Sequence, residues 1–218
     1  MARYTGPKCR YCRAEQTPLY LKGTRCMSAH CPFRKDTSSK KTGLPGADPH
    51  IKGKKPTDYG VQLREKQKLK RMYGLLEKQF KLTFADAARF SGKTGDNMLI
   101  LLERRLDNVV YRLHFAESRS QAVQFISHGH IFVNGKRCDI PSFRVSVGDV
   151  ISIRPESQKH NIFRDNLSQY AKKENNCVSW MSLDTDAMKG TFNSYPLRSD
   201  IPDLEKINEQ LIVELYSR

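Results

Sequence analysis

Four cysteines near the start of the chain have the type and spacing of metal ligands. Cys9, Cys12, Cys26 and Cys31 follow the pattern C-x2-C-x13-C-x4-C. Two closely spaced pairs separated by a loop allow four thiolates to surround one tetrahedral ion. A site of this kind has no open position for water, so we expect it to hold structure rather than to catalyse a reaction.

The same four cysteines could instead hold an iron–sulfur cluster, form two disulfides or be four unrelated thiols. The opening Met1-Ala2-Arg3-Tyr4 is polar and not an apolar signal segment, so we expect a reducing cytosol, which disfavours disulfides. The sequence therefore predicts one structural Zn2+, with an iron–sulfur cluster as the lesser alternative. Cys138 and Cys177 stand alone and are interpreted as ordinary small residues.

The charge of the chain indicates a polyanionic partner. The net charge is +15, and it is unevenly distributed. Residues 174–218 hold four Lys or Arg and eight Asp or Glu, whereas residues 1–173 hold 34 and 15, a net of +19. This predicts a body that faces RNA or DNA and a tail that packs on protein or points away from phosphate. A charge of this size suits nucleic acid or an anionic membrane surface, and of these we expect nucleic acid and no membrane partner. No apolar run approaches about 18 residues, so nothing in the chain is expected to span a bilayer.

The first half of the chain predicts helices. Residues 32–58 are rich in Pro, Gly, Lys and Ser and predict a basic linker. The apolar spacing of Tyr59–Phe80 predicts an amphipathic helix, and that of residues 96–113 predicts a second one. Between them, Thr83 and Asp86 form a capping pair that predicts the start of a short helix.

The next fifty residues change to short strands and turns. Ser118 is expected to begin a helix that Gly129 ends. Asn134-Gly135 predicts a tight hairpin turn between strands at 131–133 and 136–140, because both turn residues must adopt positive φ. The remaining expected elements are strands at 143–147, 150–153 and 178–183, and a helix over 203–216 with Pro202 at its start.

These elements predict an α+β protein. We expect a mostly helical N-terminal domain with a four-cysteine metal-bound arm, followed by a small RNA-binding domain of helices and antiparallel sheet. The expected boundaries are 1–45 for the arm, 46–100 for the helical domain, completed by the helix at 203–216, and 101–200 for the α+β domain, whose core motif is 104–153.

Several segments resemble one known family. The segment RRLDNVVYRLHFAESRSQAVQFISHGHIFVNGKRCDIPSFRVSVGDVISI (104–153) resembles the RNA-binding domain named after the fourth small-subunit ribosomal protein. The opening MARYTGPKCRYC, the segment DYGVQLREKQKLKRMYG and the ending INEQLIVELYSR resemble that ribosomal protein family itself. The resemblance covers nearly the whole chain in the same order and includes the four N-terminal cysteines of one bacterial form.

The resemblance implies a structural constituent of the small (30S) ribosomal subunit in the cytoplasm. It implies a primary binder of 16S ribosomal RNA that nucleates assembly of the subunit body and contributes to translational accuracy. The implied protein neighbours are small-subunit ribosomal proteins five and twelve. Messenger RNA is implied as a partner at the place where it enters the subunit. The protein's own messenger is a further implied partner, because some members of the family repress their own translation.

The candidate RNA contacts are basic and polar residues, which suit the phosphate and ribose oxygens of a folded RNA. In the helix–hairpin segment they are Arg119, Ser120, Gln121, His128, His130, Asn134, Lys136 and Arg137. The preceding long helix adds Arg104, Arg105 and Arg112, the helix at 59–80 adds Arg64, Lys66, Lys68, Lys70 and Arg71, and the linker adds Lys52, Lys54 and Lys55.

Two short motifs resemble parts of enzymes, but neither has the sequence context that the enzyme requires. Gly92-Lys93-Thr94 resembles the end of a phosphate-binding loop, yet Ala87 occupies the position of the first glycine and a helix precedes it. Arg105-Leu106-Asp107 resembles the catalytic aspartate motif of pseudouridine synthases, yet it lies within an amphipathic helix. Asp107 is therefore expected to be a helix-surface carboxylate or an arginine partner.

We predict a protein that is not an enzyme. The competing classes are an RNA-modifying enzyme and a free RNA-binding regulator or heat-shock factor with the same domain.

Overall fold

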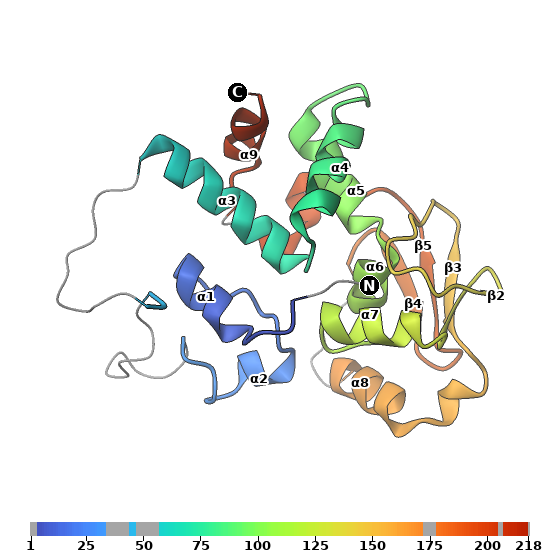
Figure 1. Ribbon diagram of the computed structural model, residues 1–218. Coiled ribbons are helices and arrows are strands. Elements are labelled where there is room, and N and C mark those ends of the chain that lie inside the picture. The colour runs from blue at the N-terminus through green and yellow to red at the C-terminus, as the bar shows by residue number, and fades with distance from the viewer. Residues whose placement is uncertain (1–3, 34–43, 47–56, 172–177, 205–206, 218) are drawn as a thin grey trace. The chain divides into compact units, whose positions relative to one another are not determined.

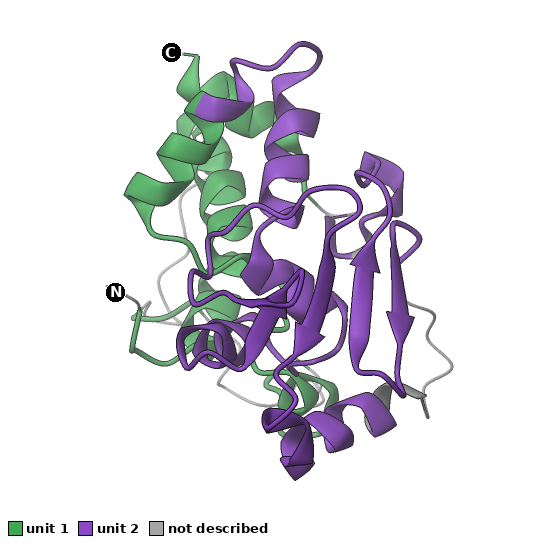
Figure 2. Cartoon of the chain, turned by 90° about the vertical axis from the view of Figure 1, so that its right-hand side faces the viewer, with its two compact units in different colours: residues 1–85, 206–218 green, residues 86–205 purple. Residues whose placement is uncertain are grey.

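A computed structural model describes residues 4–33, 44–46, 57–171, 178–204 and 207–217 (Figure 1). The chain divides into two compact units: residues 1–85 together with 206–218, and residues 86–205 (Figure 2). Within the described ranges, no helix combines the length and the apolar character needed to cross a bilayer.

The first unit is built from helices. They are α1 (Cys9–Glu15), α2 (Thr24–Met27), α3 (Asp58–Met72), the larger part of α4 (Glu77–Ala87), and α9 (Glu209–Tyr216). The C-terminal helix α9 packs against α3, and Leu69, Tyr73, Phe80 and Ile212 are buried in this unit. The Thr57 hydroxyl caps α3 by accepting a hydrogen bond from the N–H of Gly60 at 3.2 Å.

The predicted helix Tyr59–Phe80 is interrupted in the structure. It is divided between α3 and α4, with Gly74 in the break at a φ of +68°, a conformation that glycine adopts without a Cβ penalty. The predicted cap at Thr83 is wrong, because Thr83 lies inside α4 and donates its hydroxyl hydrogen to the carbonyl oxygen of Gln79 at 3.0 Å. Apolar periodicity continues across both positions and therefore did not reveal the break.

The predicted helix over residues 96–113 also divides, into α5 (Thr94–Glu103) and α6 (Leu106–Arg112). The loop expected to form a strand at Phe143–Val147 crosses this junction instead. The N–H of Leu106 donates to the carbonyl of Phe143 at 2.8 Å, and the N–H of Val145 donates to the carbonyl of Arg104 at 2.8 Å. The backbone groups freed by the break are thus satisfied by a distant segment.

The second unit contains a five-stranded antiparallel sheet. Its strands are β1 (Ile131–Val133), β2 (Lys136–Arg137), β3 (Val150–Ile153), β4 (Met181–Asp184) and β5 (Lys189–Phe192), in the order β2-β1-β3-β5-β4. The hairpin prediction is confirmed, with φ of +50° at Asn134 and +76° at Gly135. The strand predicted at 178–183 is β4, whereas β5 had no prediction.

Helices of the second unit lie beside the sheet (Figure 1). Besides α5 and α6 they are α7 (Arg119–Ser127), α8 (Asn161–Ala171) and the 3-10 turns 157–159, 198–200 and 202–204. Phe115, Ile126, Phe163, Trp180 and Phe192 are almost fully buried in this unit. Helices with an antiparallel sheet confirm the predicted α+β class. The predicted helix at 203–216 is shorter, because residues 202–204 form a 3-10 turn and α9 begins at Glu209.

Candidate RNA interface and cysteine cluster

The helix–hairpin segment has the local geometry expected from its sequence. The Ser118 hydroxyl caps α7 by accepting a hydrogen bond from the N–H of Gln121 at 3.3 Å. The side-chain oxygen of Gln121 accepts a hydrogen bond from the N–H of Glu117 at 2.7 Å. The amide of Asn134 donates to Asp149 at 2.8 Å and accepts from the N–H of Val150 at 2.9 Å. Gln121 and Asn134 therefore hold the backbone in place.

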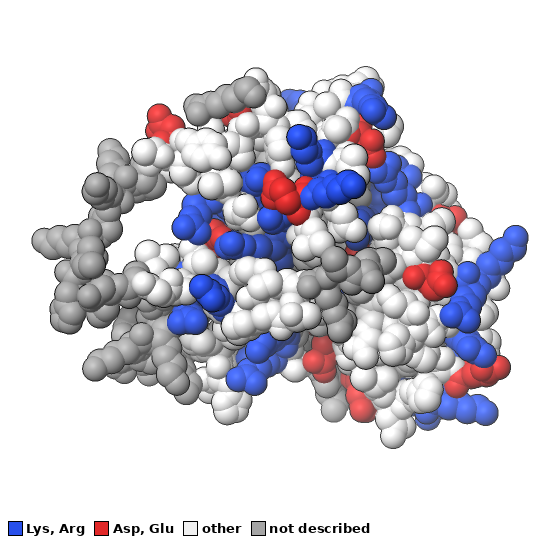
Figure 3. All heavy atoms as spheres, in the orientation of Figure 1, with Lys and Arg blue, Asp and Glu red and all other residues white. Residues whose placement is uncertain are grey.

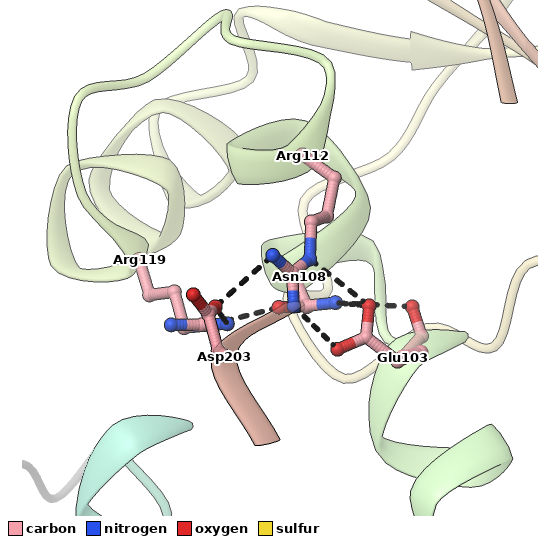
Figure 4. Close-up of polar contacts among 5 residues, drawn as sticks. All are labelled: Glu103, Asn108, Arg112, Arg119 and Asp203. Carbon is pink, nitrogen blue, oxygen red and sulfur yellow. Dashed lines mark hydrogen bonds and ion pairs between the residues drawn. The ribbon is translucent and has the colours of Figure 1, made fainter. Parts of the chain in front are cut away.

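Two of the predicted RNA-binding arginines belong to an internal ion network (Figure 4). Arg112 donates two hydrogen bonds to Glu103, at 3.1 Å and 2.9 Å, and lies 3.0 Å from Asp203. Arg119 donates to Asp203 at 3.1 Å and to the side-chain oxygen of Asn108 at 2.8 Å. The Asn108 amide completes the network by donating to Glu103 at 2.7 Å.

This network is almost closed to solvent. The side chain of Glu103 is 0% exposed, that of Arg112 6% and that of Arg119 10%. Burial raises the pKa of Asp203, but the positive charges of Arg112 and Arg119 outweigh it, so that the net pKa lies below its ordinary value. Each buried charge thus has an opposite charge beside it, as stability requires. The structure gives Arg112 and Arg119 a role in packing; a contact with RNA stays a prediction for them.

The two arginines before α6 are also held internally. Arg105 forms two hydrogen bonds with Asp107, at 3.2 Å and 2.7 Å. Burial raises the pKa of Asp107, and the charge of Arg105 opposes that shift. Asp107 is therefore an arginine partner, as predicted, but it is buried and not on the helix surface. Arg104 donates to the carbonyl of Val145 at 2.9 Å.

Exposed cations remain on the hairpin. They are Lys136 and Arg137 on β2; Ser120 in α7 and His128 at its end are also exposed, and His130 is partly buried. Figure 3 shows Lys and Arg side chains along the edge where β2 lies in Figure 1, with acidic side chains between some of them. A cavity of about 420 Å3 beside β2 is lined by Phe132, Arg137, Arg154, Pro155 and Glu156. This edge can receive phosphate groups, because guanidinium groups offer fork-shaped donors to their oxygens.

Most of the predicted cations of α3 have acidic partners in the first unit. Lys66 and Lys70 contact Glu77 at 2.5 Å and 2.7 Å, Lys68 contacts Glu65 at 2.5 Å, and Arg71 pairs with Glu15. Lys66 is buried. The side chain of Arg64 is 56% exposed and lies 3.8 Å from Glu15, which leaves it the most accessible of this set. Lys52, Lys54, Lys55 and Cys177 lie outside the described residues.

The four predicted metal ligands line one small cavity. Cys9, Cys12, Cys26 and Cys31 share the walls of a space of about 20 Å3 between α1 and α2. Burial raises the pKa of the Cys12 and Cys26 thiols, and the nearby cysteines raise it further. A backbone hydrogen bond lowers it in each case, from Leu19 to Cys12 and from Lys22 to Cys26. Among the described residues, however, no group of three or more His, Cys, Asp or Glu side chains has a geometry that could hold a metal ion.

The donor set fits a soft ion chemically. Thiolates at mutual short range repel one another unless a cation lies between them, and Zn2+ is such a cation. The N–H of Lys22 donates to the Cys26 sulfur at 3.3 Å, the kind of contact that supports a thiolate ligand. Cys138 is partly buried, and its sulfur lies 4.0 Å from the carbonyl oxygen of Ile140; its interpretation as an ordinary residue stays a prediction.

Comparisons with known proteins cover the whole chain. Residues 3–103 match a family described as ribosomal protein S4/S9 N-terminal domain, and residues 104–151 match the S4 domain. Over 218 residues the chain is 50% identical to small ribosomal subunit protein uS4 of Syntrophomonas wolfei, with all of both chains covered. It is 53% identical, again over all of both chains, to the protein of the same name from Thermoanaerobacter sp. strain X514.

Proposed function

The chain belongs to the family of small ribosomal subunit protein uS4, and we propose that it binds 16S ribosomal RNA directly within the 30S subunit. The family consists of structural ribosomal proteins and not of enzymes. The observation that carries the proposal is the similarity along the full length, which includes both the helical part and the S4 domain. A position in the ribosome, and thus in the cytoplasm of a bacterial cell, follows from the same family.

The finer roles rest on the family resemblance of the sequence. The protein binds the ribosomal RNA early and nucleates assembly of the subunit body. There it borders ribosomal proteins five and twelve and the path by which messenger RNA enters, and it contributes to translational accuracy. Its own messenger is a further RNA partner. The excess of positive charge in residues 1–173 supports contact with RNA in each of these roles.

The exposed hairpin cations are the primary RNA contacts in this proposal. Lys136 and Arg137 stand apart from the buried network and lie at the β2 edge, with Ser120 and His128 near the ends of α7. Arg112 and Arg119 instead fix the helices that present this edge. Lys and Arg that neutralise phosphates release counterions, so binding of this kind weakens as the salt concentration rises.

The cysteine cluster holds one structural Zn2+ in this proposal, with an iron–sulfur cluster as the lesser alternative. The shared cavity of Cys9, Cys12, Cys26 and Cys31 and the N–H donor at Cys26 support it. The bound ion would balance the thiolate charges and thereby order the arm formed by α1 and α2. The thiols must lose their protons to bind, so affinity for the ion rises with pH.

Binding to a 16S RNA transcript tests the proposed function. The full chain should bind the transcript more tightly than a transfer RNA of similar charge density, with an affinity that falls as salt is added. Chemical footprinting should show a discrete protected region. Equal affinity for both RNAs, with no protected region, would overturn the proposal of specific ribosomal RNA binding.

A further inference from the structure

Three histidines gather beside the cavity at the β2 edge. His128 follows α7, His130 precedes β1, and His160 precedes α8. The ring centroids of His128 and His130 are 6.1 Å apart, and those of His130 and His160 are also 6.1 Å apart. Three separate elements of the second unit thus bring three imidazoles together, with His130 in the middle.

His130 is held in a defined position. Its Nδ1 atom lies 2.9 Å from the hydroxyl oxygen of Ser157, which is buried. Its carbonyl accepts a hydrogen bond from the N–H of Arg154 at 2.8 Å. The rings of Phe125 and Phe163 lie edge-on to it, with centroids 6.1 Å away in each case. The imidazole therefore has a hydroxyl partner at one nitrogen and apolar walls.

Two arginines lie near the histidines. Arg154 follows β3 and lines the cavity. Its guanidinium group pairs with Glu156, which lines the same cavity. Arg137 on β2 crosses Gly129, the residue between His128 and His130. A Cβ atom at Gly129 would lie 2.5 Å from the Nε atom of Arg137, so a side chain there would displace the guanidinium group.

The surroundings of His130 favour its neutral form in the free protein. Burial lowers the pKa of His130, and the nearby His128, His160 and Arg154 lower it further. Each effect disfavours a further positive charge on His130, close to Arg137 and Arg154. A phosphate group at this edge would reverse the balance, because an opposite charge favours the protonated imidazole.

We propose that RNA phosphate binding at the β2 edge is coupled to protonation of the cluster formed by His128, His130 and His160, so that affinity for RNA rises as pH falls. The inference rests on the proposed RNA-binding function and adds a proton linkage to it. The sign follows from that linkage: the complex binds more protons than the free protein, so lower pH favours the complex.

RNA affinity as a function of pH tests this coupling. Binding of the full chain to the 16S transcript is measured at constant salt from about pH 8 to about pH 6, the range in which imidazoles titrate. The dissociation constant should fall by about 3- to 30-fold across this range, as expected for uptake of one or two protons. The triple variant His128→Gln, His130→Gln, His160→Gln should change by about twofold or less over the same range.

A histidine outside the cluster serves as the matched control. His114 has a φ of +57°, which asparagine tolerates well, so His114→Asn should keep the pH dependence of the wild type. NMR titration of the imidazoles in the wild type gives a second readout that needs no variant. The pKa values of the clustered histidines should be higher in the RNA complex than in the free protein.

Each outcome has a distinct meaning. Absence of RNA binding at every pH would contradict the proposed function itself. Tight binding with the same pH dependence in the wild type and the triple variant would overturn only the proton coupling. Unchanged imidazole pKa values on addition of RNA would overturn it as well, even if the triple variant did not fold.

Discussion

The buried ion network of the second unit and the cysteine arm of the first unit differ in what stabilises their buried polar side chains. In the network, Glu103, Arg112 and Arg119 are buried with opposite charges inside the same unit. In residues 4–33 the buried side chains are three cysteines, Glu15 and a single large apolar residue, Leu19. The network supplies its own counter-charges, whereas the arm has too little apolar surface to fold without help. In the proposal above, an ion bound by the four thiols supplies that stabilisation.

The largest effect is expected from the cysteines. Replacing any one of Cys9, Cys12, Cys26 or Cys31 by serine should release the ion and loosen residues 4–33, because structural zinc contributes on the order of 10 kcal/mol of coupled binding and folding. Elemental analysis should find one ion per chain in the wild type and less in each variant. Hydrogen exchange should show loss of protection in α1 but not in α7.

Cys138→Ser is the matched control and should keep the full metal content. A metal-free wild type whose four thiols all react freely would contradict the prediction that an ion stabilises the cysteine arm. Iron with a visible absorption band would assign the cluster instead of zinc.

The next prediction concerns how much the buried ion pairs of the network contribute to the stability of the second unit. Glu103→Gln removes one of the two carboxylates beside the buried Arg112 and leaves Asp203 as its remaining acidic partner, which should lower the free energy of unfolding of the second unit by about 3 kcal/mol. Asp86→Asn removes a partly exposed partner of Arg144, whose own side chain is 44% exposed, and should cost about 1 kcal/mol or less. Chemical denaturation monitored at Trp180 compares them; equal losses would show that burial does not distinguish the two pairs.

A third test locates the RNA face among the exposed cations. Reversing the charges of Lys136 and Arg137 together should weaken RNA binding by about tenfold or more and lower the salt slope by about one for each lost phosphate contact. The exposed pair Lys78 and Lys81 on α4 provides a control of equal charge change. Filter binding over a range of salt concentrations measures both. Equal losses from the two pairs would contradict an RNA face at the β2 edge.

The smallest effect concerns Glu77, which accepts a hydrogen bond from the Tyr216 hydroxyl of α9 at 3.3 Å. Burial raises the pKa of Glu77, but hydrogen bonds from Lys66 and Lys70 outweigh it and lower the pKa to about 2, from an ordinary value of 4.5. The stabilisation is therefore complete above about pH 4.5 and is lost as pH falls through about 2. The side chain is half exposed, so Glu77→Gln should cost about 0.5–1 kcal/mol at neutral pH.

Hydrogen exchange of α9 in the wild type and in Glu77→Gln measures this effect. The difference between the two proteins should shrink as the pH is lowered toward about 2, where the wild-type carboxylate gains its proton. A difference that stays constant down to that pH would show that the Glu77 charge does not hold the helix.

Elements coded by neighbouring residues were predictable. The Ser118 cap, the end of α7 at Gly129 and the Asn134-Gly135 turn each depend on contacts within a few residues, and all three are confirmed. The breaks at Gly74 and at Arg104-Arg105 were missed, because the apolar spacing continues across them. The strand β5 was also missed. Its sequence Lys-Gly-Thr-Phe is weakly apolar, and it forms by pairing with β3 and β4.

The sequence alone determined the spacing of the four cysteines, the positive charge of residues 1–173 and the helix–hairpin that resembles a known RNA-binding domain. Only the tertiary structure decided which cations face solvent. Arg119 and Asp203 are 84 residues apart in the chain, yet they form an ion pair that removes Arg119 from the exposed set. Local hydrogen bonds leave a pattern in adjacent residues, whereas the Arg119–Asp203 pair depends on packing between distant segments and leaves none.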